Sequence, residues 1–330
     1  MTSDPPDPAA PAIDAVKLVR GVVDAVETVV VGKRDVIEFV LMAVLSRGHV
    51  LVEDVPGIGK TVLSRAMARA LGLSFARVQF TPDLLPQDLT GTLVFDQRTS
   101  DFTFRAGPVF TQFLLADEIN RTPPKTQAAL LEAMAEQQVT TDGESRTLPD
   151  PFFVMATSNP IEYEGTYVLP EAQLDRFVAR IQMGYLDPSD EASMLGERLR
   201  REVTERNLPA ALADGQLPEL RRLRAEVTIH PDLLDYIVAV VGATREHASV
   251  AVGASPRGGL AMGALAQAAA LLDGRTYVLA DDVKRVARPA LGHRIVIRPD
   301  LWATRVTGDS VVDDVLSEVP TPEPEAEEVP

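Results

Sequence analysis

The chain has 330 residues, carries a formal net charge of −16 at pH 7 and contains no cysteine. Disulfide frameworks and thiolate metal sites are therefore excluded, and the four histidines are too scattered in sequence to suggest a His-rich metal motif. The hydrophobic content of 45% is ordinary for a globular protein, and the length is sufficient for two domains.

The N-terminal residues 1–12 are polar and rich in proline. They lack the basic-then-apolar pattern of a secretory signal, so we expect a disordered tail on a cytoplasmic protein. A turn at Val31-Gly32 then precedes a helix predicted over residues 35–45.

The segment 49–61 predicts a buried strand, a glycine-bearing loop and the start of a helix. Backbone N–H groups of such a loop point at the phosphates of a nucleotide, Lys60 adds a positive charge, and the hydroxyl of Thr61 can ligate Mg²⁺. The general G-x-x-x-x-G-K-[ST] pattern has glycine where this chain has Asp54, so the motif alone leaves a surface turn as an alternative. The predicted nucleotide contacts are Pro56, Gly57, Ile58, Gly59, Lys60, Thr61 and Val62.

A later apolar run ends in two carboxylates, Asp117 and Glu118, as a buried strand delivers acids to its carboxyl end. Asp117 would hold Mg²⁺ through water, and Glu118 would orient and deprotonate the attacking water. The alternative is a strand that ends in a solvated acidic turn. A further strand precedes Asn159, whose amide would position that water or sense the γ-phosphate, unless Asn159 only forms a turn before Pro160.

Strand and helix patterns alternate up to about residue 185, which favours a parallel sheet covered on both faces. Five strands are predicted, near residues 49–53, 75–80, 112–117, 152–156 and 179–185. Two segments do not fit this alternation. Residues 92–105 predict a hairpin inserted in a helix, and residues 138–148 predict a second hairpin around Asp142-Gly143.

From residue 187 to about residue 292 the pattern is helical, and Asp187-Pro188 is a plausible domain boundary. Ser255 can cap a helix that has Pro256 at its first position, which puts Arg257 in the first turn. The apolar segment 260–272 is well short of the roughly 20 residues that cross a bilayer. It therefore predicts a buried helix and no membrane span.

Four strings in this sequence resemble the MoxR family of AAA+ ATPases, and they occur in the family's order. They are Phe80–Gly91, Gly107–Phe110, Asp117–Arg121 and Glu164–Phe177. The resemblance covers roughly residues 20 to 300. The phosphate loop of the family is similar to Glu-[Gly or Asp]-x-Pro-Gly-x-[Gly or Ala]-Lys-Thr, so Asp54 departs from the general pattern but not from that of the family.

The resemblance implies an α/β fold, with an AAA+ P-loop core, a five-stranded parallel sheet and two β-hairpin inserts, followed by a helical lid domain. We expect a core over residues 13–186, a lid over 187–308 and an acidic tail rich in Pro and Glu over 309–330. Eight acidic residues and no basic ones lie from residue 309 onward. Such a tail is usually only solubilising, but docking of a partner or autoinhibition stays open.

The family's functional residues can be carried onto this chain one by one. Lys60 and Thr61 match the phosphate and Mg²⁺ contacts, and Asp117 and Glu118 match the metal and water carboxylates. Asn159 matches the first sensor, and Arg176 matches an arginine finger that acts in trans on the γ-phosphate held by a neighbour. Arg257 matches the second sensor, reaching the nucleotide from the chain's own lid, and Val31-Gly32 matches the segment that packs on adenine.

By resemblance, we expect an ATPase that requires Mg²⁺ and forms a homo-oligomeric, usually hexameric, ring. It would couple hydrolysis to chaperone-like remodelling, assembly, or metal or cofactor insertion of a client, possibly together with a von Willebrand factor A domain protein. Two alternatives stay open. A nucleic-acid motor is disfavoured because the hairpin at 138–149 carries Asp142 and Glu144 against one Arg146, and a nucleotide-sensing scaffold predicts loss of Glu118 or Arg176, which are present.

Overall fold

The computed structural model describes residues 14–98, 100–159, 166–167, 169–200 and 208–322. The expected N-terminal tail, residues 1–12, lies outside this described part, as do residues 323–330 of the expected acidic tail. One family string, Glu164–Phe177, is described only in part.

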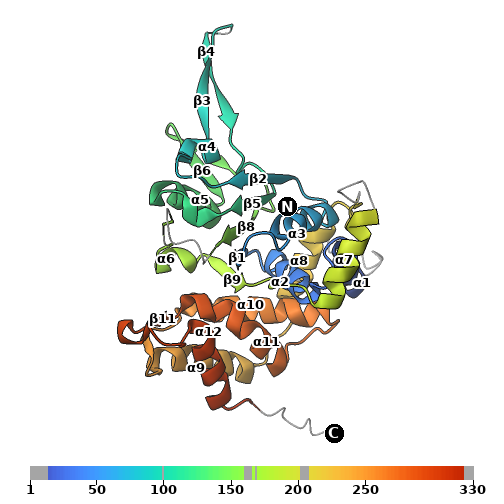
Figure 1. The fold of residues 1–330 in the computed structure, drawn as a ribbon, viewed down its shortest axis with the longest axis vertical. Coiled ribbons are helices and arrows are strands. Elements are labelled where there is room, and N and C mark those ends of the chain that lie inside the picture. The colour runs from blue at the N-terminus through green and yellow to red at the C-terminus, as the bar shows by residue number, and fades with distance from the viewer. Residues whose placement is uncertain (1–13, 99, 160–165, 168, 201–207, 323–330) are drawn as a thin grey trace, which may run out of the picture.

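A five-stranded parallel sheet forms the centre of the molecule (Figure 1), in the order β2-β5-β8-β1-β9. Its strands are β1 (His49–Glu53), β2 (Phe75–Gln79), β5 (Phe113–Asp117), β8 (Phe153–Ser158) and β9 (Phe177–Ile181). The fold class and the number of strands were thus predicted correctly, although the last strand, expected near 179–185, ends at Ile181. Because β8 lies between β1 and β5, the segments that follow these three strands meet at one edge, which we call the carboxyl edge.

The central strands are apolar throughout because both faces of the sheet are covered. Val50 and Val52 pack into one hydrophobic cluster, with the helices α1 (Ala15–Glu27), α2 (Arg34–Leu45) and α3 (Lys60–Ala70). Leu51 points the other way, into a second cluster beneath helix α5 (Pro124–Glu136). The alternation of side chains along β1 therefore holds helices on both faces.

Two hairpins extend from the α/β core. The first, β3 (Gly91–Asp96) and β4 (Asp101–Ala106), projects far from the sheet (Figure 1), and the second consists of β6 (Gln138–Thr141) and β7 (Glu144–Thr147). The first was expected to interrupt a helix, which was wrong in part. A five-residue helix, α4 (Pro86–Thr90), precedes it, whereas residues 107–112 form turns because Pro108 lacks an N–H and Gly107 lies against the α4 backbone.

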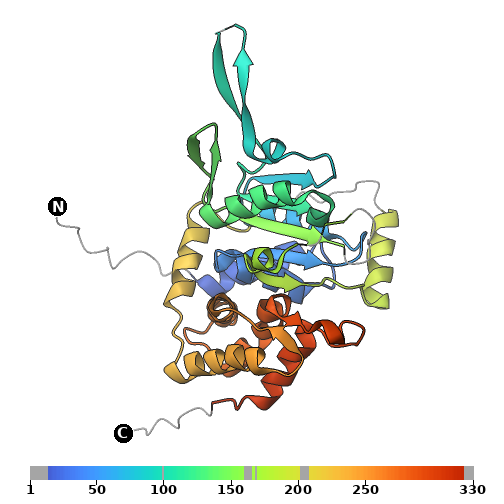
Figure 2. The same cartoon turned by 90° about the vertical axis from the view of Figure 1, so that its left-hand side faces the viewer.

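After β9 the chain is mainly helical. Figure 2 shows α7 (Pro188–Arg200) and α8 (Gln216–Glu226) flanking the sheet on opposite sides, with the other helices in a layer beneath it. This layer contains α9 (Pro231–Glu246), α10 (Pro256–Leu272), α11 (Ala280–Leu291) and α12 (Gly308–Glu318), and a small sheet of β10 (Val250–Val252) and β11 (Val296–Ile297). Short helices complete the chain: α6 (Glu171–Leu174), η1 (Ile119–Arg121), η2 (Gly292–Arg294) and η3 (Pro299–Leu301).

Helix α10 begins as predicted, with Ser255 accepting a hydrogen bond from the backbone N–H of Arg257 and Pro256 in the first turn. Most of its apolar segment is buried, in the same cluster as α1, α2 and α3. In the described part of the chain, no helix is long and apolar enough to cross a membrane.

The predicted start of the acidic tail at residue 309 was wrong, because the chain continues as α12 to Glu318. The acids there obscured an apolar stripe of Val311, Val312 and Val315, all of which are buried. Asp309, Asp313 and Asp314 each pair with a base, namely Arg180, Arg288 and His247. These carboxylates belong to the folded helical layer and not to a tail.

Candidate active site

The loop between β1 and α3 leads directly into the N-terminus of a helix. Gly57 and Gly59 adopt φ angles of +86° and +96°, which residues with a side chain rarely adopt. A Cβ at either position would meet nothing within 4 Å, so glycine is required here for its backbone conformation and not for space. The predicted contacts Pro56 to Val62 therefore lie at the N-terminus of α3, where anions are favoured.

Asp54 has a structural task that explains why it replaces glycine. Its Oδ1 accepts a hydrogen bond from the backbone N–H of Val55 at 2.8 Å. Its Oδ2 accepts two more, from Met183 N at 2.8 Å and Gly184 N at 2.7 Å. The loop is thereby fastened to the segment that connects β9 to α7.

Lys60 lies among acceptors at the carboxyl edge. Its Nζ donates to the backbone oxygen of Asp54 at 2.5 Å. Burial lowers the pKa of Lys60, while the charges of Asp54, Asp117 and Glu118 oppose this shift. The structure therefore brings the loop lysine and the predicted pair of carboxylates into one electrostatic neighbourhood.

Asp117 ends β5 and has a partner on each oxygen. Its Oδ1 accepts from Thr157 Oγ1 at 2.7 Å. Its Oδ2 accepts from Arg77, with Nη2 at 2.7 Å and Nε at 3.2 Å. The carboxylate is thus fixed in orientation by the strands on either side of β5.

Glu118 follows in the left-handed conformation, with φ of +58°, which is uncommon outside glycine. Its backbone N–H donates to Thr157 Oγ1 at 2.8 Å, and its Oε2 accepts from Gln79 Nε2 at 2.7 Å. Arg121 Nη1 lies 3.2 Å from the same Oε2. This backbone turn aims the second acid away from the direction that the strand would give it.

Sequence reasoning missed Arg77, Gln79 and Thr157. A signal for two of them was present, because Arg77 and Gln79 are polar residues at alternate positions of a predicted strand and therefore share a face. Gln79 is in register with Asp117 in the parallel pair β2–β5. Without the strand order, nothing indicated that this face adjoins the two carboxylates.

Asn159 directly follows β8 and is buried, with 5% of its surface exposed. Its backbone oxygen accepts a hydrogen bond from Asn120 Nδ2 at 3.3 Å. Since β8 separates β1 from β5, Asn159 emerges between the phosphate loop and Asp117. The structure thus brings Lys60, Asp117, Glu118 and Asn159 to the same edge.

The turn at Val31-Gly32 is more constrained than its sequence suggests. Gly32 has φ of +68°, and a Cβ there would lie 2.2 Å from Asp190 Oδ2 in α7. Lys33 Nζ donates to the backbone oxygen of Tyr185 at 2.7 Å. This turn therefore packs against the same β9–α7 connection that Asp54 holds.

Arg176 lies at the opposite edge of the sheet from the phosphate loop. It precedes Phe177, which is in register with His49, the first residue of β1, whereas the loop follows Glu53, the last. The four steps along β1 span roughly 13 Å at about 3.3 Å per residue. We call this second edge, where the parallel strands begin, the amino edge.

Arg257 also lies at the amino edge, with Nη1 3.7 Å from Asp175 Oδ2. This position does not fit the expectation that Arg257 reads the nucleotide of its own chain, because Asp175 is beside Arg176 and away from Lys60. The helical layer carries the start of α10 to this edge. The predicted site residues therefore form two groups, one at each edge.

The donor set at the carboxyl edge suits magnesium. The hydroxyl of Thr61 and the carboxylate of Asp117 are hard oxygen ligands, and Mg²⁺ commonly takes one or two carboxylates, with substrate phosphates and water completing its shell. Within the described residues, no group of three His, Cys, Asp or Glu side chains could hold a metal ion.

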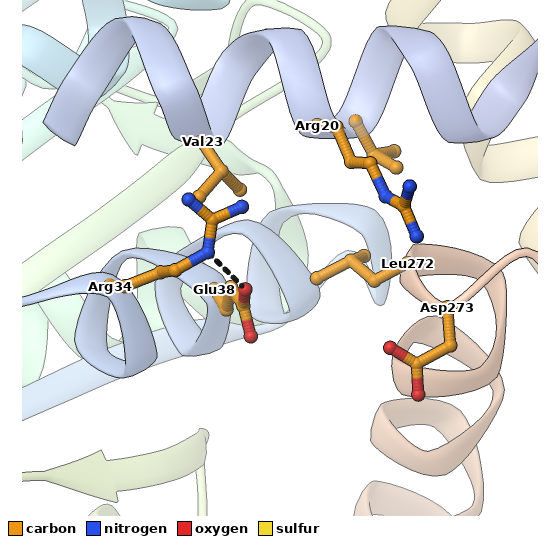
Figure 3. A pocket seen from close by; sticks show the side chains of 7 residues that line it. Arg20, Val23, Arg34, Glu38, Leu272 and Asp273 are labelled. Atoms are coloured by element: carbon orange, nitrogen blue, oxygen red, sulfur yellow. Dashed lines mark ion pairs between the residues drawn. The ribbon is translucent and has the colours of Figure 1, made fainter.

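A separate cavity of about 280 Å³ lies between α1, α2 and the end of α10 (Figure 3). The ion pair between Arg34 Nε and Glu38 Oε1, at 3.3 Å, crosses its wall, and Arg20 and Asp273 face each other across it. None of its lining residues belongs to the phosphate loop or to the ends of β5 and β8. This cavity is therefore not part of the candidate site.

Comparison with known proteins agrees with this geometry. Residues 49–179 match the family model of ATPases associated with various cellular activities (AAA), and residues 242–315 match an AAA lid domain. The chain is 46% identical over 300 residues to an uncharacterised protein, YeaC, of Bacillus subtilis, covering 91% of this chain and 93% of that protein. It is 43% identical over 307 residues to the chaperone MoxR1 of Mycobacterium tuberculosis, covering 90% and 81%.

A solved structure leads to the same grouping. The crystal structure of a proposed ATPase from Cytophaga hutchinsonii superposes with a TM-score of 0.88 at 38% identity, covering 94% of this chain and 96% of that chain. The protein MoxR of Paracoccus denitrificans is 34% identical over 326 residues, covering 90% of this chain and 94% of that protein. The likeness thus extends over both the sheet and the helical layer.

Proposed function

Because the chain belongs to the MoxR family of AAA+ ATPases, we propose that it hydrolyses ATP at a site shared between neighbouring subunits of a ring. The observation that carries the proposal is the separation of the two groups of predicted site residues. Lys60, Asp117 and Glu118 gather at the carboxyl edge, while Arg176 and Arg257 lie at the amino edge. One chain cannot bring both groups to a single γ-phosphate, whereas two adjacent copies can.

In this proposal the carboxyl edge is the pocket. The N–H groups of the loop cradle the phosphates, Lys60 turns from the Asp54 carbonyl toward them, and Val31-Gly32 packs on the adenine. Thr61 and Asp117 would hold Mg²⁺, which would supply a cation for the charge that develops on the phosphates of the substrate. Glu118 accepts a proton from the attacking water, and Asn159 positions that water.

Glu118 must leave part of its present environment to act. Its Oε2 is engaged by Gln79 and Arg121, so the carboxylate has to exchange at least one of these contacts for a contact with water. Asp117 similarly shares Oδ2 with Arg77. In this proposal, binding of the magnesium nucleotide would exchange some of these contacts for contacts with water and Mg²⁺.

The amino edge supplies the complementary charge. We assign Arg176 the role of a finger that stabilises the transition state in the neighbouring pocket, and cations supplied in this way are worth about 10³- to 10⁵-fold in rate. Arg257 then acts beside it in trans, which replaces the expected role on its own nucleotide. Six subunits are the usual number in related rings, and we propose a hexamer.

The work done by hydrolysis is proposed to be chaperone-like remodelling or assembly of a client protein, or insertion of a metal or cofactor into it. Support comes from the name of one relative, the chaperone MoxR1. The projecting β3–β4 hairpin adds an exposed aromatic pair, Phe95 and Phe102, with ring centroids 5.2 Å apart, which suits contact with a protein chain. A von Willebrand factor A domain protein is the proposed helper.

A nucleic-acid motor is less well supported. The base that the β6–β7 hairpin offers, Arg146, pairs with Glu144 at 2.5 Å and stacks on the Phe104 ring at 4.0 Å. Phosphate tracking needs cations that are available to the backbone of the nucleic acid. A scaffold that only senses nucleotide is disfavoured because Glu118 and Arg176 are both present.

The proposal is tested with purified chain, ATP and Mg²⁺. Phosphate release is expected for the natural sequence, and Glu118→Gln should abolish it while ATP binding and assembly persist. If a homogeneous Glu118→Gln preparation released phosphate at the rate of the natural chain, Glu118 would not be the residue that deprotonates the attacking water. The ATP-bound Glu118→Gln ring then serves as a trap for identifying the client in cell extract.

A further inference from the structure

The segment that carries Arg176 is held by side chains of the helical layer. Asp175 Oδ1 accepts a hydrogen bond from Arg294 Nε at 2.7 Å. The Ser255 hydroxyl lies 3.3 Å and 3.4 Å from the two Asp175 oxygens, and Arg257 Nη1 lies 3.7 Å from Oδ2. One carboxylate thus joins the chain just before Arg176 to η2 and to the first turn of α10.

Arg294 also binds the backbone on both sides of Arg176. Its Nη2 donates to the carbonyl oxygens of Asp175 at 3.2 Å and Phe177 at 2.8 Å. His293 Nε2 lies 3.1 Å from the same Phe177 oxygen. These contacts fix the Asp175–Arg176 peptide and the Phe177–Val178 peptide, which flank Arg176 on either side, so the direction in which its side chain leaves the backbone depends on η2.

The ion pair between Asp175 and Arg294 is suited to hold the backbone in place because the Arg294 side chain is buried, with 4% of it exposed. A buried guanidinium is stable only when its charge and donors are matched, and Asp175 supplies the charge. By contrast, 68% of the Arg257 side chain is exposed. Asp175 therefore pairs with one buried arginine, Arg294, and with one arginine, Arg257, that faces solvent.

We infer that Asp175 and Arg294 are positioning residues that seat Arg176 and Arg257 together for the nucleotide of the neighbouring subunit. Asp175 holds Arg257 beside Arg176, and Arg294 fixes the backbone that carries Arg176. A movement of the helical layer then moves both cations as one unit. The inference deepens the proposed function and rests on it, since it concerns the half of the shared site that the amino edge contributes.

Complementation tests it with the full-length chain, because mixing reveals which half of the shared site a variant damages. Asp175→Asn subunits are mixed with Lys60→Ala subunits and, separately, with Arg176→Ala subunits, and phosphate release is measured across mixing ratios. Activity returns in the first mixture, since intact pockets meet intact arginines. It stays at the level of the parents in the second mixture, because both chains then carry a damaged amino edge.

Alone, Asp175→Asn should lower kcat at least tenfold and leave KM and ATP-analogue affinity unchanged, because its own pocket is intact. A residue that only supports the fold would impair binding as well. Asp175→Glu should recover part of kcat. Asp300→Asn, in the exposed pair that Arg298 Nε and Asp300 Oδ1 form at 3.1 Å, is the matched control and should keep natural activity.

If Asp175→Asn fails to fold, the double variant Asp175→Asn/Arg294→Gln takes its place, since it removes both charges of the buried pair. Natural kcat in the folded variant, or recovered activity in the mixture with Arg176→Ala, overturns the inference. Lack of hydrolysis by the natural chain, or a dead mixture of Arg176→Ala with Lys60→Ala, counts against the proposed function instead. The two failures are therefore distinguishable.

Discussion

Thr157 Oγ1 donates a hydrogen bond to Asp117 Oδ1 at 2.7 Å, and the same Thr157 Oγ1 accepts a hydrogen bond from the backbone N–H of Glu118 at 2.8 Å. One buried side chain on β8 therefore orients the Asp117 carboxylate and fixes the backbone of Glu118. Removing the hydroxyl while keeping the shape, as in Thr157→Val, leaves Asp117 Oδ1 without its donor and the Glu118 N–H without its acceptor, so that Arg77 alone orients the Asp117 carboxylate.

We predict that Thr157→Val lowers kcat for ATP hydrolysis by about 10- to 100-fold, the range typical of residues that orient a metal ligand. The Mg²⁺ concentration needed for half-maximal activity should rise in parallel. Steady-state kinetics over a magnesium titration measure both. Thr157→Ser, which keeps the hydroxyl, is the control, and equal loss in the two variants would contradict the role assigned to the hydroxyl.

The Asp54 contacts lead to a prediction about stability. Asp54→Ala leaves the N–H groups of Met183 and Gly184 without their acceptor, and we expect a loss of about 1–3 kcal/mol in the free energy of unfolding. Urea denaturation measures it. Asp35→Ala, at an exposed position in the first turn of α2, is a comparison that should cost less. Similar losses in both would mean that the bonds to the β9–α7 connection contribute little.

Two buried histidines predict acid sensitivity. Burial lowers the pKa of His49 from 6.5 to about 4, and burial also lowers the pKa of His293 well below 6.5. The unfolded chain binds these protons near pH 6.5 and the folded chain does not, so stability is complete above pH 6.5 and falls as the pH drops toward 4. His49 alone should account for about 2 kcal/mol between pH 7 and pH 5.

Urea denaturation at several pH values checks this prediction. His49→Gln should flatten the loss of stability below pH 6.5. Equal slopes in the natural chain and in His49→Gln would refute the assignment.

Helix α12 predicts where the chain can be shortened. Ending the chain at Pro322 keeps α12 whole and serves as the reference. Ending it at Thr307 removes the buried side chains of Val311, Val312 and Val315, leaves Arg288 without Asp313, and removes one of the two acidic partners of Arg180. Tm should fall by at least several degrees, since about 1 kcal/mol corresponds to a shift of a few degrees. Calorimetry distinguishes the two endings.

Much of the carboxyl edge could be predicted from sequence because its signals are local. Strand, loop and helix follow one another over residues 49–61, and two acids end an apolar run at Asp117 and Glu118. Arg77 and Thr157 were not predicted, because their roles depend on which strands are neighbours. Neighbouring parallel strands are separated by long stretches of sequence, so local periodicity does not predict the strand order.

Prediction from sequence has the same limit for the part of the helical layer that lies at the amino edge. The cap at Ser255 and the place of Arg257 in the first turn of α10 followed from local chemistry. The edge of the sheet that Arg257 reaches depends on α7 and α8, which carry the chain around the core before α9 begins. For α12, the acids along its exposed face made an amphipathic helix resemble a tail, and only its buried valines reveal it.

The central claim, that one chain's carboxyl edge works with its neighbour's amino edge, is tested most directly by mixing Arg176→Ala subunits with Lys60→Ala subunits and measuring phosphate release. Each variant alone should be inactive. Mixtures should regain activity that peaks at intermediate ratios, because some interfaces pair an intact pocket with an intact finger. Mixtures that co-assemble, as shown by differently tagged subunits purifying together, and yet stay inactive at every ratio would contradict the claim.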